Sequence, residues 1–404
     1  MMELEEWYNV ACSCVHCRAC TSSDIHMTGD ENLPICPKGN MFKMESFFAC
    51  GAHEIIRAMI EGEITENSER LQHVIYSCTM CGYCSYHCEL YSPPGQKCKK
   101  MGKTFVNIWQ DLRADMMKRG WGPLEAHNAI LKNVANTDNA WGGTRADRER
   151  WAKGLNAKDL NKETADVLYF AGCTTTYDPK LKAMMTTAAE IFNRAGVDWG
   201  ILGKNEKCCA GPSLRVGDRD QFKAYAQENI DLFKKTGVKT IVTSCAGCYS
   251  TFKNEYPEIA DMDGIEVLHV TEFIARLIKE KKIEFTKEVP MKVTYHDPCH
   301  IGRYVGVFDE PRTILRAVPG IELKEMIQNR RNSWCCGAGA GMRTALPDVA
   351  SETGQHRVKQ AEDTGAEVLV SSCPFCAQNL MDAIKEADSD LKFMDITEIL
   401  AQAL

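Results

Sequence analysis

The chain has 404 residues, of which 44% are hydrophobic and 25% charged, a composition typical of a folded protein with two or three domains. Its net charge of −7 and the absence of a long Lys or Arg run argue against nucleic acid as the main partner. No continuous apolar stretch reaches about 18 residues, so no transmembrane segment is expected. The acidic start, Met1 to Trp7, is unlike a signal peptide. We therefore expect a cytoplasmic protein that reaches a membrane only through a partner.

Cysteine is the unusual component, with 21 residues. The cysteines gather in Cys-x-x-Cys and Cys-Cys groups, and adjacent cysteines do not easily bond to each other. In a reducing compartment such groups are more often metal ligands than disulfides. We interpret them as metal–sulfur ligands, with a disulfide framework or zinc alone as the less favoured alternatives.

Residues 1–136 are expected to form a helical domain around two cysteine runs. The second run has the ferredoxin spacing C-x₂-C-x₂-C-x₃-C, and the first has the same start with its fourth cysteine displaced. In two-cluster ferredoxins the fourth cysteine of each run binds the other cluster. The spacing thus predicts two cubane [4Fe–4S] clusters, one held by Cys14, Cys17, Cys20 and Cys88, the other by Cys78, Cys81, Cys84 and Cys36.

Three further cysteines in this region lie outside the pattern. Cys12 is an alternative to Cys14 in a different loop, although Cys14 keeps the regular spacing. Cys50 and Cys98 are interpreted as buried small hydrophobic residues, because free cysteine often behaves that way. Apolar periodicity predicts helices over 46–63, 101–119 and 123–134 that pack around the clusters.

Residues 137–165 are expected to be a linker, because the segment 137–145 is polar and rich in glycine. A short helix is predicted over 148–155. A domain boundary follows, and a different pattern begins at Asp166.

From Asp166 onward, short apolar strands alternate with helices. Strands are predicted over 167–171, 197–202 and 240–244, with helices over 181–195 and 221–235, which favours a largely parallel sheet. Cysteines follow each strand, at the edge where open α/β sheets place their sites. These five cysteines form the first array: Cys173, Cys208, Cys209, Cys245 and Cys248.

The same arrangement occurs a second time. Cys299 follows Cys173 by 126 residues, Cys335 follows Cys208 by 127, and Cys373 follows Cys245 by 128. The second array is Cys299, Cys335, Cys336, Cys373 and Cys376. The near-constant offset predicts two duplicated α/β lobes, 166–288 and 289–404, related by a pseudo-twofold axis. The expected fold class is therefore α+β overall, a helical ferredoxin-like domain followed by two parallel-sheet lobes.

One cysteine, then Cys-Cys-Gly, then Cys-x-x-Cys resembles the cysteine-rich CCG domain. That domain occurs in catalytic subunits of heterodisulfide reductases and in iron–sulfur subunits of some glycolate, lactate and glycerol-3-phosphate dehydrogenases. The cysteine runs of residues 1–136 and the stretch from Asn139 to Trp151 are also similar to those proteins. The order of the parts looks most like the membrane-associated type of heterodisulfide reductase catalytic subunit.

The resemblance implies that each five-cysteine array holds a noncubane [4Fe–4S] cluster and that a disulfide binds between the two. The first copy reads Cys-Cys-Ala-Gly at 208–211, so zinc or an ordinary cubane stays open as an alternative there. No catalytic residue is assigned beyond the cluster irons. His300 and Arg303 after Cys299, and His296 before it, are weak candidates for orienting an anionic substrate or for tuning a cluster's potential through hydrogen bonds. Capping of loops and packing against the sheet is the plainer interpretation.

The resulting hypothesis is an iron–sulfur oxidoreductase with heterodisulfide-reductase-like disulfide/thiol chemistry. Cleavage of a disulfide needs two electrons, and two flanking clusters fed by the cubanes would each supply one and capture one sulfur. Since no flavin or nucleotide motif is present, hydride chemistry is expected on partners, namely flavin, ferredoxin-like or membrane cytochrome subunits. The alternative is an electron-transfer subunit of a larger anaerobic complex, as in the larger benzoyl-CoA reductases or the dehydrogenases above. A redox-sensing or zinc-structured interaction protein is a third, less favoured interpretation.

Overall fold

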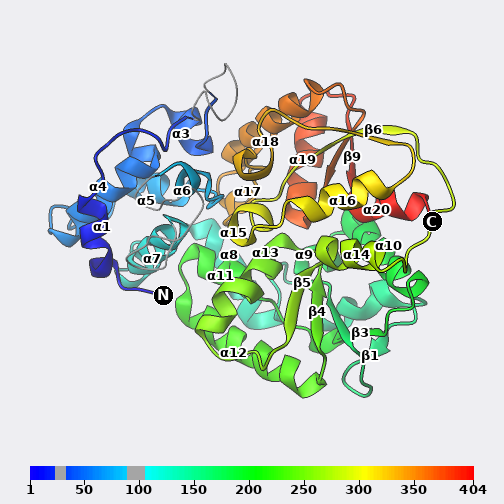
Figure 1. The fold of residues 1–404 in the computed structure, drawn as a ribbon. Helices are drawn as coiled ribbons and strands as arrows, with labels where there is room; N and C mark the ends of the chain where they lie inside the picture. The colour runs from blue at the N-terminus through cyan, green and yellow to red at the C-terminus, as the bar shows by residue number, and fades with distance from the viewer. Residues whose placement is uncertain (23–32, 89–104) are drawn as a thin grey trace.

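The computed structural model describes residues 1–22, 33–88 and 105–404 (Figure 1). Its N-terminal region is helical, and the remainder forms two α/β lobes, each built on a parallel sheet. Two parallel sheets of five and four strands confirm the α/β architecture expected beyond residue 166. Cys98 and the first residues of the helix expected over 101–119 lie outside the described residues.

The N-terminal region packs short helices around buried aromatic side chains. Trp7, Tyr76 and Trp109 are almost fully buried in one cluster, and the Trp7 Nε1–H donates to Asp111 Oδ2 over 2.8 Å. The elements are η1 (Leu4–Trp7), α1 (Tyr8–Cys12), α3 (Pro37–Phe42), η2 (Glu45–Phe47), α4 (Ala49–Ile60), α5 (Glu69–Tyr76), α6 (Tyr83–His87), α7 (Phe105–Lys118) and α8 (Glu125–Thr137). The helix expected over 46–63 is thus α4, which starts later because η2 comes first.

The first lobe contains a five-stranded parallel sheet in the order β1-β3-β2-β4-β5. The strands are β1 (Lys158–Asp159), β2 (Val167–Phe170), β3 (Trp199–Ile201), β4 (Thr240–Thr243) and β5 (Glu266–His269). The α-helices are α9 (Cys173–Tyr177), α10 (Lys182–Arg194), α11 (Gly211–Val216), α12 (Arg219–Thr236), α13 (Ala246–Ser250) and α14 (Val270–Lys279). The 3₁₀ helices are η4 (Arg145–Ala152), η5 (Pro179–Leu181), η6 (Gly203–Asn205) and η8 (Tyr256–Glu258), and η7 (Thr251–Glu255) is a short π-helix. The segment 137–165 contributes η4 and the edge strand β1, which pairs with β3. Its Leu160, directly after β1, is buried in the core of the lobe and anchors the segment there.

The second lobe repeats this topology in a four-stranded sheet, β7-β6-β8-β9. The strands are β6 (Met291–Tyr295), β7 (Ile321–Lys324), β8 (Val368–Ser371) and β9 (Lys392–Asp395). The helices are α15 (Gly302–Val305), α16 (Asp309–Ala317), α17 (Met342–Ala345), α18 (Pro347–Glu362), α19 (Pro374–Glu386) and α20 (Ile396–Gln402), with η9 (Arg330–Asn332).

Equivalent positions in the two lobes make the same contacts. The Tyr169 hydroxyl bonds Ser244 Oγ at 2.7 Å, and the Tyr295 hydroxyl bonds Ser372 Oγ at 2.7 Å. In both sheets the first long strand, β2 or β6, lies between the two strands that follow it, so the chain changes direction beside it. Ligands bind at such switch points, outside the carboxyl ends of the strands.

The lobes pack directly against each other. Helix α14 of the first lobe packs on α16 of the second, and α20 of the second packs on α10 of the first. One hydrophobic cluster spans both lobes and includes Phe192 and Ile399. The switch points of the two sheets are thereby held at fixed positions relative to each other.

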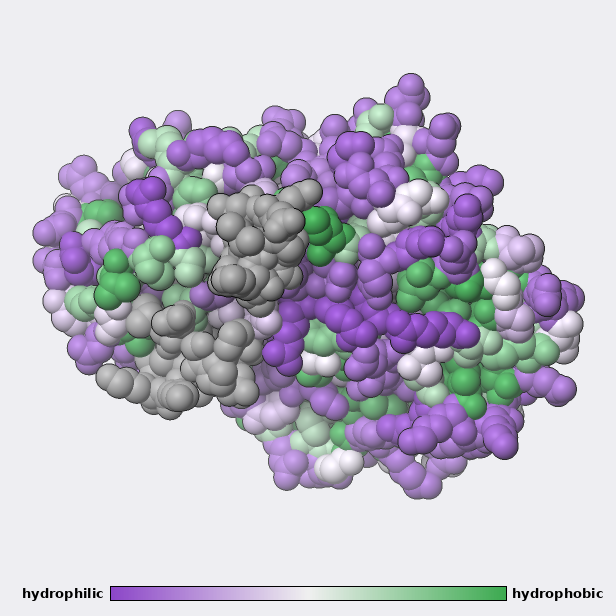
Figure 2. Space-filling view, turned by 45° about the horizontal axis from the view of Figure 1, so that its top comes forward, coloured by the Kyte–Doolittle hydropathy of each residue, from purple (hydrophilic) through white to green (hydrophobic). Residues whose placement is uncertain are grey.

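The surface is predominantly polar. On the face drawn in Figure 2, hydrophilic side chains surround smaller groups of hydrophobic ones, as in most folded proteins in water. Within the described residues, none of the helices combines the length and the apolar character needed to cross a bilayer.

Candidate metal centre

The first array lies at the switch point of the first sheet. Gly172, with φ of +79°, turns the chain after β2 so that Cys173 begins α9. Cys245 follows β4 and precedes α13, whose Cys248 places its Sγ 3.3 Å from Cys209 Sγ. All five thiols of this array are buried. The fold therefore gathers in one place soft ligands that are spread over 76 positions, residues 173–248.

The second array has the same geometry. Cys376 Sγ lies 3.3 Å from Cys336 Sγ, and the Gly337 N–H donates to Cys335 Sγ over 3.3 Å. The matching contact in the first array is the Ala210 N–H, 3.4 Å from Cys208 Sγ. The Cys-Cys-Ala-Gly sequence thus preserves the backbone donor, because alanine keeps the N–H of the glycine that it replaces.

Both arrays line a single cavity of about 210 Å³ between the lobes. All ten thiols border it: Cys173, Cys208, Cys209, Cys245, Cys248, Cys299, Cys335, Cys336, Cys373 and Cys376. Its lining also includes the basic residues Arg215, His300 and Arg343, and, among the described residues, no Asp or Glu. Such a site suits an anionic molecule flanked by two thiolate-rich centres.

The described cysteines are all free thiols, and this contradicts a disulfide framework for that part of the chain. Even the paired sulfurs, at 3.3 Å, are much farther apart than the roughly 2.05 Å of a disulfide. Two arrays of five thiols are a soft donor set that fits iron–sulfur clusters.

Hydrogen bonds and a buried cation favour the thiolate form of Cys173 in the first array. Hydrogen bonding from Cys208 lowers the pKa of the Cys173 thiol to about 7 against the opposing effect of burial. Arg148 adds to this lowering, because its Nη2 lies 3.3 Å from Cys173 Sγ while its Nη1 pairs with Glu206 at 2.7 Å. In both arrays, hydrogen bonds from neighbouring cysteines lower the pKa of the second Cys of the pair, Cys209 or Cys336. A lowered pKa favours metal binding at these cysteines, since the thiolate is the binding form.

The structure brings Cys36 together with three members of the second ferredoxin-type run. Burial, followed by repulsion from Cys36, Cys81 and Cys78, raises the pKa of the Cys84 thiol well above its usual value. Lys38 is buried beside these thiols, and its Nζ donates to Val74 O over 2.7 Å. Among the described residues no carboxylate pairs with Lys38, so an anionic cluster is the counter-charge that fits.

This run contacts the second array directly. Cys335 Sγ donates to Thr79 Oγ1 over 3.4 Å, and Cys81 lies within hydrogen-bonding reach of Cys335. Gly339 permits the approach, because a Cβ there would lie 2.3 Å from Thr79 O. Arg113 supports the same loop, donating to Cys78 O over 2.8 Å and to Arg215 O over 2.8 Å.

The first ferredoxin-type run lies nearer the surface. Cys14 is half-buried, Cys17 is exposed and Cys20 is buried. Cys50, expected only as a small hydrophobic residue, is indeed buried, and hydrogen bonding with Cys20 is the main cause that raises its pKa. Cys88 follows α6, close to Cys84 of its own run. Cys12 is exposed.

Comparison with known proteins matches these features. A family model described as a cysteine-rich domain, CCG, matches residues 167–253 and again 293–381, once in each lobe. The chain is 34% identical over 401 residues to a subunit of the dihydromethanophenazine:CoB–CoM heterodisulfide reductase of Methanosarcina mazei, covering 97% of this chain and 93% of that protein. The Methanosarcina barkeri protein of the same name is 35% identical, over 83% of this chain and 79% of its own length.

The chain belongs to the CCG-domain family of heterodisulfide reductase subunits. The predicted family resemblance is confirmed, and the chain is an iron–sulfur oxidoreductase. It is also 32% identical to the EtfAB:quinone oxidoreductase of Syntrophomonas wolfei, over 82% of this chain and 46% of that protein.

Two of the polar residues singled out beside Cys299 occupy different places in this heterodisulfide reductase homologue. His300 lines the cavity, with Nδ1 3.2 Å from Cys299 Sγ, and its Nε2 accepts from Arg215 Nε over 3.1 Å. Arg303 does not line the cavity and instead donates to the carbonyls of Cys81, Arg331 and Ser333. His300 is therefore placed to face a bound molecule, whereas Arg303 holds the ferredoxin-type loop against the second lobe.

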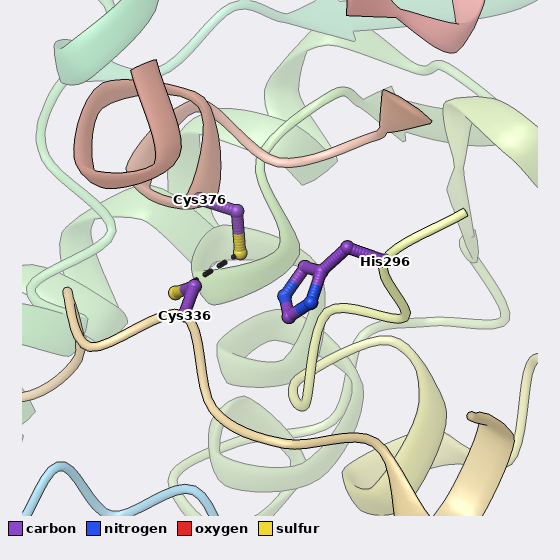
Figure 3. A group of neighbouring side chains, drawn as sticks. All are labelled: His296, Cys336 and Cys376. Carbon is purple, nitrogen blue, oxygen red and sulfur yellow. Dashed lines mark hydrogen bonds between the residues drawn. The ribbon is translucent and has the colours of Figure 1, made fainter. Parts of the chain in front are cut away.

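Several residues around the site of this heterodisulfide reductase homologue carried no sequence signal. Arg113, Arg148 and Arg215 are buried cations that contact cluster loops or cysteines from helices and turns distant in the chain. His296, in contrast, was a weak candidate from its place before Cys299, and Figure 3 shows that its imidazole faces Cys336 and Cys376. A nitrogen of His296 and these two sulfurs lie within 4.8 Å of one another. Only contacts between distant segments distinguish these side chains from ordinary buried polar residues.

Proposed function

We propose that the chain is the disulfide-reducing subunit of a larger redox complex, and that its substrate binds in the cavity between the lobes. The observation that carries the proposal is that all ten thiols of the two arrays line one cavity. A cavity bordered by both arrays allows a single disulfide to meet both centres at once. The similarity to a subunit of heterodisulfide reductase supports the same reaction class.

The proposed cofactors are two cubane and two noncubane [4Fe–4S] clusters. The cubanes would be held by Cys14, Cys17, Cys20 and Cys88 and by Cys78, Cys81, Cys84 and Cys36, and each noncubane cluster by one array. The repeated Sγ–Sγ and N–H···S contacts support the same cluster type in both arrays. When bound, the clusters supply the electrons that cleave the substrate's S–S bond.

The proposed domains are a ferredoxin-like domain over 1–136, a linker over 137–165, and CCG lobes over 166–288 and 289–404. Reciprocal packing of α14 on α16 and of α20 on α10 supports a pseudo-twofold axis between the lobes. The contact between Cys81 and Cys335 supports electron entry into the second array from the second ferredoxin-type cluster.

The chain's own polar residues would bind and orient the substrate. Arg215 and Arg343 bring positive charge, and neutral His300 brings a hydrogen-bond donor, to a lining that has no carboxylates among the described residues, which favours a disulfide of anionic thiols. Because His300 Nε2 accepts from Arg215, its proton lies on Nδ1, directed at Cys299. His300 thus orients the Cys299 sulfur, and Arg215 fixes His300.

Other redox subunits are the proposed partners, carrying flavin, a ferredoxin-like centre or a membrane cytochrome. The loop of the first run supports electron entry there, since Val15 is 82% exposed and Cys17 is exposed. A cytoplasmic location, membrane-associated through such a partner, agrees with a thiol-rich chain that needs reducing conditions.

Anaerobic iron, sulfide and zinc analysis with EPR tests the cofactor assignment. We expect about sixteen irons per chain, four for each of four clusters, with no zinc. About eight irons with one zinc would contradict a pair of noncubane clusters. An EPR signal that appears in the oxidised protein when a thiol is added would support binding of the substrate at a noncubane cluster.

The second candidate is an electron-transfer subunit without a substrate, as in the larger benzoyl-CoA reductases or the iron–sulfur subunits of lactate, glycolate and glycerol-3-phosphate dehydrogenases. The similarity to EtfAB:quinone oxidoreductase favours this interpretation. Reduction of a mixed disulfide of two anionic thiols by a chemically reduced dye distinguishes the two. Turnover by the isolated, fully loaded chain supports the reductase, and electron passage without S–S cleavage supports the relay.

A further inference from the structure

His296 follows β6 directly and is 1% exposed. Arg357, on α18, donates from Nε to His296 Nδ1 over 3.0 Å. Arg357 is held in place by the Gln328 carbonyl at 2.7 Å and by Gln360 Oε1 at 2.6 Å. Because Nδ1 accepts a hydrogen bond, the neutral ring must carry its proton on Nε2.

The Nε2 atom is buried and has no hydrogen-bond partner among the described residues. The ring faces Cys336 and Cys376, with one ring nitrogen and both sulfurs inside 4.8 Å (Figure 3). A buried N–H without an acceptor is costly, so its environment must supply one. Sulfur of a cluster bound by these cysteines is the acceptor that the geometry offers.

His296 is unsuited to be an iron ligand. Ligation through Nε2 would require the proton on Nδ1, which would then face the Arg357 N–H, donor against donor. Nor does His296 line the cavity, so it does not reach a substrate.

We propose that His296 is a positioning residue that donates its Nε2–H to sulfur of the second cluster and raises that cluster's reduction potential; this rests on the proposed cluster in the second array. A hydrogen bond to sulfur withdraws negative charge and favours the reduced state. The second array is also the one that contacts the ferredoxin-type loop through Cys335. A higher potential there favours electron flow from the cubane into the cavity.

The first lobe provides an internal control for His296. Tyr169 and Tyr295 are equivalent, since each bonds a serine hydroxyl in the same way. The residues that follow them are Phe170 and His296, so Phe170 stands in the first lobe where His296 stands in the second. Phe170 packs on Phe233 and Phe252 and has no donor to offer. The first array instead receives Arg148 at Cys173. The duplicated centres therefore take their hydrogen-bond donors from different places.

The test is an EPR-monitored redox titration of the full chain purified anaerobically. His296→Phe, which copies the first lobe, should shift the midpoint of the second cluster to lower potential while iron content stays at the wild-type level. His296→Gln retains an N–H and should restore part of the shift. Phe170→Leu is the matched control and should leave that midpoint unchanged. An unchanged midpoint in fully loaded His296→Phe overturns the proposal, as does selective loss of the second cluster in both His296 variants, which would make His296 a ligand.

Pulsed EPR of protein labelled with ¹⁵N-histidine keeps the proposal testable if His296→Phe loses its iron. We expect a weak nitrogen coupling at the second cluster that persists in His300→Gln and disappears in His296→Gln. A coupling that survives in His296→Gln, or one of ligand strength, contradicts the proposal. The two proposals can fail separately. If His296→Phe shows the expected shift in midpoint but the wild-type protein cleaves no disulfide, the proposed function is refuted and this inference stands.

Discussion

The two cysteine arrays share their internal geometry and differ in their surroundings. In both, the second Cys of the pair approaches the last Cys to 3.3 Å, and a backbone N–H faces the first. Around the first array lie Arg148 and Phe170; around the second lie His296 and the loop that carries Cys81. The two lobes thus share their cysteine geometry, while contacts from outside each array make the two sites different.

Removal of one ligand from either array is the most severe test of whether the two act as a pair. Cys209→Ser and Cys336→Ser should each lose about four irons, and each should reduce disulfide cleavage more than about 100-fold, because a cluster ligand matters at least as much as its outer-shell partners. Iron analysis and the dye-linked assay give the answer. If one variant loses its cluster yet keeps full turnover, the arrays do not work together.

The buried cation of the first array should matter for stability. Arg148→Met leaves Glu206 buried without its partner and should cost about 3–5 kcal/mol of unfolding free energy in anaerobic urea titrations. Arg150→Met removes an exposed charge from the same 3₁₀ helix, η4, and should cost less than about 1 kcal/mol. Equal losses in the two variants would show that the buried pair of Arg148 with Glu206 stabilises the fold no more than the exposed pair of Arg150 with Asp147.

The caps of the final helix in each lobe should respond to pH with opposite signs. Burial raises the pKa of Asp395, before α20, from 3.8 to about 7, so the folded chain favours the protonated carboxyl. The resulting stabilisation is fully present below about pH 4 and is lost as the pH rises through 7. Burial lowers the pKa of His269, before α14, to about 3 from 6.5, so stability is lost as pH falls below 6.5.

Unfolding free energies between about pH 5.5 and about pH 7 measure this difference. In the wild-type protein Asp395 should lower stability as the pH is raised, and Asp395→Asn should remove that loss. His269 should lower stability as the pH is lowered, and His269→Asn should remove that loss. Slopes that change in the same direction in both variants would contradict the opposite assignment.

The smallest effect is expected at Cys50. Cys50→Ser should leave the iron content unchanged, because in the proposed ligand set Cys14, Cys17, Cys20 and Cys88 already supply four thiolates to the first cubane. Cys88→Ser should lose about four irons. Iron analysis of both variants decides the ligand set, since Cys50 lies against Cys20. If the outcomes are reversed, Cys50 is the fourth ligand.

Much of the fold and of the site was predictable because the signals are local or periodic. Cys-x-x-Cys spacing, strand–helix alternation and the offset of 126 to 128 residues all act over short stretches or repeat. The strand β1 escaped prediction because two residues, Lys158 and Asp159, carry no pattern of their own and pair only with a sheet formed elsewhere.

The amino-acid sequence by itself determined the family, the two five-cysteine arrays and the duplicated parallel sheets, since ligand type and hydrophobic period depend on residue order alone. Only the tertiary structure decided that all ten thiols share one cavity, and that Cys335 meets Thr79, 256 residues away. It also decided that Arg357, 61 residues from His296, directs the imidazole proton toward the second array. These features arise from packing between distant segments, and packing is settled only when the whole chain has folded.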